Sequence, residues 1–168
     1  MADTFQCILD VLGKSDKDDA FERLAAALGE RPNLFVETPK TLEYRCDSGF
    51  HLSFFKEEDF FFVAYIHPKS FKGDLPKNLR WGDTPDEVER KLGINPLAYD
   101  LFPGTYPEDP KHLQETYSCE PFLWKCYFDF SSGGLQSITL LFDSKKIPKG
   151  NEQVRRTWIE GRGPQEPS

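Results

Sequence analysis

The sequence lacks any run of apolar residues close to the ~20 that a membrane-spanning helix requires. A secretory signal needs a basic stretch followed by an uninterrupted apolar segment. The opening residues MADTFQCILDVLG have no basic stretch, and Gln6 and Asp10 interrupt their short apolar run. We therefore expect neither a membrane anchor nor export, and we predict a cytoplasmic protein.

Motifs for metal binding and catalysis are also missing. The three histidines have no His-x-x-x-His spacing, and the four cysteines form no Cys-x-x-Cys pair. Those cysteines are Cys7, Cys46, Cys119 and Cys126. We expect reduced and mostly buried thiols, no metal ion, no cofactor and no catalytic residues, which favours a protein that is not an enzyme.

Basic residues are outnumbered, with 21 Lys and Arg against 28 Asp and Glu and a net charge of −7. A nucleic-acid-binding surface needs clustered Lys and Arg to meet the phosphates, so this balance argues against nucleic acid as a partner. An acidic chain instead attracts a basic protein by long-range steering.

Aromatic residues are abundant, with 15 Phe, 6 Tyr and 3 Trp against a single Met. Rigid rings of this kind pack well on a pleated surface and favour a sheet-based core over a helical bundle. A chain of 168 residues is long enough for one domain or for two small fused modules.

The best-defined local element is a helix over residues 84–92. Thr84 is a good N-cap, Pro85 suits the first helical position, and Glu87 completes a capping box. Gly93 is a typical stop signal, and Pro96 prevents the helix from resuming. Two more helices are predicted near the start of the chain, over about residues 2–12 and from a cap at Ser15 to residue 28.

Alternating apolar and polar residues predict strands between and after these helices. The pattern covers residues 42–46 and 50–54, and it returns at 122–130 and 135–142. Residues 34–36 are predicted to form a short strand, and residues 60–66, which are apolar throughout, a strand that is covered on both faces or lies centrally in the sheet. Between them, the segment 97–121 carries four prolines and is predicted to be mostly loop. A last helix is predicted around Trp158.

These elements occur in the same order twice. With an offset of 64 residues, the pattern Leu-Gly-x-x-Pro at 28–32 falls on the same pattern at 92–96, and aromatic strands follow each helix. We predict an α+β protein of two similar helix-plus-antiparallel-sheet modules, which could share one continuous sheet with the helices on one face. The modules are residues 1–68 and 81–144, with a linker at 69–80 and a basic and polar C-terminal segment at 145–168 whose end is disordered.

The stretch from Leu75 to Gly93 resembles a motif of small bacterial proteins built from tandem helix-plus-antiparallel-sheet modules. It reads LPKNLRWGDTPDEVERKLG, and the resemblance extends over about residues 9–142. The architecture is similar to that of the beta-lactamase inhibitor protein and, as a single module, to the small lipoprotein of the barrel assembly machinery. Relatives of this kind include proteins thought to act as immunity proteins of toxin systems.

The resemblance and the missing catalytic motifs together predict a non-catalytic, protein-binding function. We expect an immunity or inhibitor protein that occludes a partner protein, such as a basic toxin domain, with acidic residues around aromatic anchors. The candidate partner-binding residues are Glu57, Glu58, Asp59, Phe61, Tyr99, Phe102, Tyr106 and Trp124. The alternative is a small hydrolase or ligand-binding domain in which the segment 97–121 is a lid over an aromatic pocket.

Overall fold

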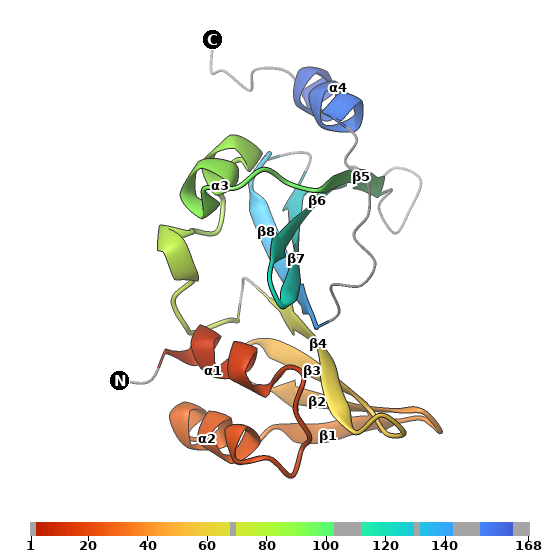
Figure 1. The fold of residues 1–168 in the computed structure, drawn as a ribbon. Coiled ribbons are helices and arrows are strands. Elements are labelled where there is room, and N and C mark those ends of the chain that lie inside the picture. Colours follow the sequence, from red (N-terminus) through yellow and green to blue (C-terminus); the bar gives the residue numbers. More distant parts are fainter. Residues whose placement is uncertain (1–2, 68–69, 103–111, 130–131, 143–151, 163–168) are drawn as a thin grey trace.

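The computed structural model describes residues 3–67, 70–102, 112–129, 132–142 and 152–162. These residues form four α-helices, one 3-10 turn and eight strands (Figure 1). The elements are α1 (Thr4–Val11), α2 (Asp19–Leu28), β1 (Asn33–Glu37), β2 (Thr41–Cys46), β3 (Phe50–Phe55), β4 (Phe60–Ile66), the 3-10 turn (Pro76–Asn78), α3 (Pro85–Leu92), β5 (Ala98–Phe102), β6 (His112–Cys119), β7 (Phe122–Asp129), β8 (Leu135–Leu141) and α4 (Glu152–Arg162).

All eight strands belong to one antiparallel sheet with the order β1-β2-β3-β4-β8-β7-β6-β5. Each half of the chain contributes four consecutive strands, and the last strands of the two halves, β4 and β8, pair with each other. The predicted α+β class is confirmed, and the two sets of strands share one continuous sheet. The repeated Leu-Gly-x-x-Pro pattern lies at equivalent places, because Gly29 and Gly93 both end a helix that precedes an outermost strand.

The helices cover one face of this sheet. Directly opposed residues of neighbouring strands form a row on that face: Tyr44, Leu52, Ala64, Leu140, Trp124 and Tyr117. Phe21 of α2 packs edge-on against Tyr44, and Phe5 of α1 packs against Trp124. Trp158 of α4 contacts the ring of Phe128, which lies four residues after Trp124 on β7 and on the same face of the sheet. One core therefore runs beneath α1, α2 and α4.

The segment 97–121 differs from its predicted loop structure. Most of its described residues form β5 and β6, which complete the second half of the sheet. A buried carboxyl group at Glu115 interrupts the apolar alternation of β6, which is why the pattern was not visible in the sequence. The rest of the predicted lid, residues 103–111, lies outside the described residues.

None of the helices in the described part of the chain combines the length and the apolar character needed to cross a membrane.

Helix α3 begins as its sequence predicts. The Glu87 N–H donates to Thr84 Oγ1 at 3.2 Å, and the Thr84 N–H donates to Glu87 Oε2 at 3.4 Å. Helix α2 differs, because its cap is Asp18 and not Ser15. The Ser15 hydroxyl instead donates to Asp59 Oδ1 at 3.0 Å, in the turn between β3 and β4.

Replacing Thr84 with alanine is expected to lower the free energy of unfolding by about 1 kcal/mol, because the Glu87 N–H at the start of α3 loses its acceptor, the Thr84 hydroxyl. Urea denaturation measures this loss. The variant Thr84→Ser keeps the hydroxyl and is the control, with an expected change near zero. Equal losses for both variants would contradict a capping role for the hydroxyl.

Candidate functional site

Five half-buried phenylalanines line one end of the sheet, and we call them the phenylalanine row. In order along the row they are Phe62, Phe55, Phe60, Phe142 and Phe122. The successive ring centroids are 3.7, 5.7, 6.0 and 5.9 Å apart, and the first pair is stacked with an interplanar angle of 10°. The row therefore crosses from the first half of the sheet to the second as one aromatic strip.

Sheet topology explains why these rings gather. Strand β3 ends, β4 begins, β8 ends and β7 begins at the same end of the antiparallel sheet. Gly13, two residues after the last residue of α1, contacts this end of the sheet at β4 and β8. Its N–H donates to the Phe61 carbonyl at 2.8 Å, and a Cβ added there would lie 2.6 Å from the Phe142 ring. With φ at +85°, this position also favours glycine on conformational grounds.

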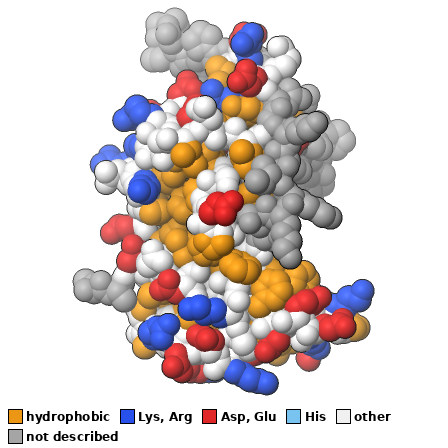
Figure 2. All heavy atoms as spheres, viewed as in Figure 1, with side chains coloured by type: hydrophobic (Ala, Val, Ile, Leu, Met, Phe, Trp, Pro, Cys, Tyr) orange, Lys and Arg blue, Asp and Glu red, His pale blue; other side chains and the backbone are white. Residues whose placement is uncertain are grey.

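The acidic turn Glu57-Glu58-Asp59 connects β3 to β4 directly beside the row. All three residues are exposed. Figure 2 shows hydrophobic side chains at the lower right, where the β3–β4 hairpin lies in Figure 1, with acidic and basic side chains next to them. Asp59 also has a structural task, since it accepts the hydrogen bond from Ser15 and adopts a positive φ of 60°. Asp59 therefore helps to hold the turn, while Glu57 and Glu58 are the turn's two other exposed acids.

Of the five aromatic anchors predicted from the sequence, the three whose side chains the structure describes do not form an exposed surface at this end. Phe61 and Trp124 are only 0% and 5% exposed, because α1 and α2 cover them, so they offer a partner almost no ring surface. Tyr99 is 7% exposed and lies on β5, in the other half of the sheet. The side chain of Phe102 and the whole of Tyr106 lie outside the described residues. The phenylalanine row was missed because three consecutive phenylalanines, 60–62, do not reveal which rings point outward.

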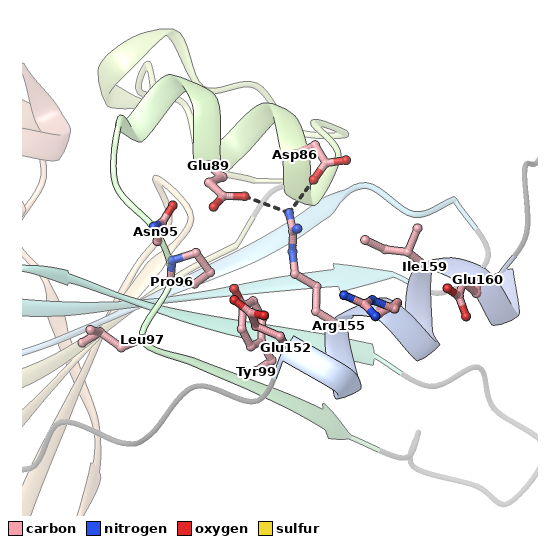
Figure 3. A pocket seen from close by; sticks show the side chains of 11 residues that line it. Asp86, Glu89, Asn95, Pro96, Leu97, Tyr99, Glu152, Arg155, Ile159 and Glu160 are labelled. Carbon is pink, nitrogen blue, oxygen red and sulfur yellow. Dashed lines mark hydrogen bonds and ion pairs between the residues drawn. The ribbon is translucent and has the colours of Figure 1, made fainter.

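A second candidate site is a cleft of about 780 Å³ between α3, β5 and α4. Arg155 crosses it, and Figure 3 shows this side chain reaching from α4 toward the acids of α3. Its guanidinium contacts Asp86 at 2.6 Å and Glu89 at 3.2 Å, and its Nε donates to Glu115 at 3.1 Å. The ring of Tyr99 lies 5.9 Å from the guanidinium carbon. Arg155 therefore joins both helices to the sheet.

Glu115 is the most deeply buried carboxyl group of this cluster, with 0% exposure. Burial raises its pKa to about 7, although Arg155 and a hydrogen bond from the Tyr117 hydroxyl at 3.1 Å oppose that rise. Each carboxyl oxygen has a donor within the fold, Arg155 for one and Tyr117 for the other. The Glu115 carboxyl group thus links β6 to α4 within the fold. The only sign of it in the sequence is an acidic residue between the apolar residues of a strand.

Two histidines on the helix-free face lie close together. The rings of His51 and His67 are 4.6 Å apart, and Phe35 packs against His51. Burial lowers the pKa of each histidine, and Arg45 nearby lowers both further. Among the residues that the structure describes, no group of three or more His, Cys, Asp or Glu side chains is arranged to hold a metal ion.

Comparisons with known proteins identify a shared fold. The sequence matches no protein-family model and none of the curated proteins. An extracellular protein containing an SCP domain from Bacillus anthracis is similar in structure, with a TM-score of 0.53 and 14% identity over 82% of this chain and 45% of that one. A cysteine-rich secretory protein from Staphylococcus aureus has a TM-score of 0.50 and 15% identity, over 79% and 43% of the two chains.

A DUF4309 family protein from Bacillus subtilis is a more distant match, with a TM-score of 0.46 and 17% identity over 79% of this chain and 81% of that one. The chain spans less than half the length of the first two proteins. At these identities the likeness concerns the fold alone. The similarity to the beta-lactamase inhibitor protein and to immunity proteins stays a prediction from the sequence motif.

Proposed function

We propose that the protein is a non-catalytic protein-binding module of the inhibitor or immunity type, which occludes a site on a basic partner protein. The observation that supports this most directly is the phenylalanine row beside the acidic turn. Half-buried rings that pack against one another are already ordered, so a partner can cover them at a low cost in side-chain entropy. Exposed acids at the rim of such a surface speed the encounter with a positively charged protein.

The partner's charge follows from the whole chain as well as from the turn. A net charge of −7 favours a basic domain, and a bacterial toxin domain is the partner that the sequence motif suggests. All four cysteines are free thiols, and Cys46 and Cys126 are buried. Free thiols suit the reducing cytoplasm, which is where an immunity protein would meet its toxin.

Binding kinetics with the product of the neighbouring gene test this proposal. The double variant Glu57→Gln/Glu58→Gln is expected to slow association roughly tenfold and to flatten its dependence on salt. Phe55→Ala or Phe62→Ala is expected to raise the dissociation rate about 30-fold, equivalent to about 2 kcal/mol, because each removes one ring of the stacked pair.

A matched control removes two exposed acids far from the row. Asp100→Asn/Glu160→Gln, on β5 and α4, has the same net charge as the Glu57/Glu58 variant, so it should leave association within about twofold if local steering dominates. The proposal fails if the protein captures no partner and turns over a small molecule instead. It also fails if both charge variants slow association equally while the two phenylalanine variants bind like the wild type.

A further inference from the structure

The two edges of the sheet are built differently. At one edge, β5 is covered by α4, and Ala98 and Tyr99 are only 2% and 7% exposed. At the other edge, all five residues of β1 are exposed. Its three central side chains are apolar, with exposed fractions of 50% for Leu34, 45% for Phe35 and 37% for Val36. The outer backbone groups of β1 are therefore available to another strand.

An exposed apolar edge of this kind is unusual. Proteins commonly protect edge strands with inward-pointing charges, lysine or proline, because unpaired N–H and C=O groups recruit other strands. In β1 the only charged residue is Glu37, at its last position. A β-bulge between Leu34 and Val36 twists the strand locally, but it replaces neither the apolar side chains nor the open backbone edge. The edge thus has the chemistry of an interface.

The pattern of residues around β1 is complementary to itself. In an antiparallel pair with a second copy, centred on Phe35, Glu37 lies opposite Asn33 of that copy and diagonal to its Arg31. The acid therefore meets an amide and a base, and no acid faces another acid. Arg31 now pairs with Glu22 at 2.8 Å, and Glu37 pairs with Lys56 at 3.2 Å. The side chains of Arg31 and Glu22 are 61% exposed and that of Glu37 is 53% exposed, so both ion pairs are weak and can exchange.

The fold already contains one junction of the same design. Strands β4 and β8 pair antiparallel and join two four-stranded halves into the eight-stranded sheet. A two-fold axis at Phe35, perpendicular to the sheet, would join two eight-stranded sheets likewise and would keep the helices of both copies on one face. Such an interface is isologous and closes on itself.

We propose that the protein forms a symmetric dimer through antiparallel pairing of β1 with β1 of a second copy, centred on Phe35. Five exposed residues per copy make a small interface, so the dimer forms in a concentration-dependent manner. Its axis at Phe35 lies beside His51, near the start of β3, whereas Phe55 of the phenylalanine row is the last residue of that strand. Only the last residue of β1, Glu37, approaches the row, through its contact with Lys56. The pairing uses the outer edge of β1, which the row does not include.

Sedimentation equilibrium of the full chain between about 1 and 500 µM tests the dimer, because weak interfaces of this size have dissociation constants in that range. The expected mass rises from 19.4 kDa toward twice that value. Phe35→Lys places two like charges at the axis and should weaken association at least 100-fold. Ile94→Lys changes an apolar residue with a similar exposed fraction, 38%, far from β1 and should leave association unchanged.

A charge exchange tests the antiparallel orientation independently of Phe35. Glu37→Arg places a base diagonal to Arg31 of the second copy and should weaken association about tenfold, whereas Glu37→Arg/Arg31→Glu should restore it. Far-ultraviolet circular dichroism confirms that each variant keeps its fold. The proposal is overturned if the wild type stays at 19.4 kDa throughout the range, if Phe35→Lys dimerises like the wild type, or if the exchange variant fails to recover.

Discussion

Replacing Arg155 with alanine is expected to lower the free energy of unfolding by about 3–5 kcal/mol at pH 8.5. Removing one partner of a buried ion pair leaves the other charge without compensation, and Glu115 is fully buried. The guanidinium also holds Asp86 and Glu89, so its loss releases α4 from α3 as well as from the sheet. Chemical denaturation of the wild type and the variant measures the difference.

The size of this loss depends on pH in a defined direction. Burial raises the pKa of Glu115 to about 7 in the folded state, above its ordinary value of 4.5. A raised pKa contributes stability below pH 4.5, and that contribution is lost as pH rises toward 7. Without Arg155 the folded-state pKa of Glu115 rises further, so the variant keeps losing stability above pH 7, by up to about 1.4 kcal/mol per pH unit.

The difference between variant and wild type should therefore widen between pH 6.5 and pH 8.5. Arg156→Ala is the matched control, because this neighbour on α4 is exposed, and its effect should stay within about 0.5 kcal/mol at both pH values. A loss for Arg155→Ala that is the same at both pH values would show that Glu115 keeps one protonation state. A loss below about 1 kcal/mol would contradict the role of the cluster in holding α4.

Replacing Phe61 with alanine is expected to cost about 3–5 kcal/mol, as for other large-to-small changes in a core. The ring is 0% exposed and contacts three others, with centroids 5.3 Å from Phe21, 5.0 Å from Phe54 and 5.7 Å from Tyr44. Truncation leaves a cavity beneath α2 that these rigid rings cannot fill. The shift of the urea midpoint measures the loss.

Phe62, the next residue, provides the contrast. It is half-buried and stacks on Phe55 at the surface, so Phe62→Ala should cost about 1 kcal/mol of stability and act mainly on partner binding. The two adjacent phenylalanines would then have separate tasks, one in folding and one in recognition. Equal stability losses for both variants would contradict the assignment of Phe61 to the core and Phe62 to the surface.

Local sequence signals determined several elements of this protein. Thr84, Glu87 and Gly93 specify the ends of α3 through short-range hydrogen bonds and a left-handed C-cap, and the structure has both ends where the sequence predicts them. The alternation of apolar and polar residues around Leu42, and later around Cys126, identified β2 and β7, because successive side chains of a strand point to opposite faces of the sheet. Information of this kind is available within a few residues.

Tertiary structure alone decided which side chains do which task. In 60–62 every residue is phenylalanine, so only the pairing of β4 with β3, and the helices lying over one face, place Phe61 inside and its neighbours outside. Strand β6 was hidden because Glu115 is an acid at a core position. Its partner Arg155 is 40 residues away in the chain. A local sequence pattern cannot predict this contact, because it forms only when α4 docks on the sheet.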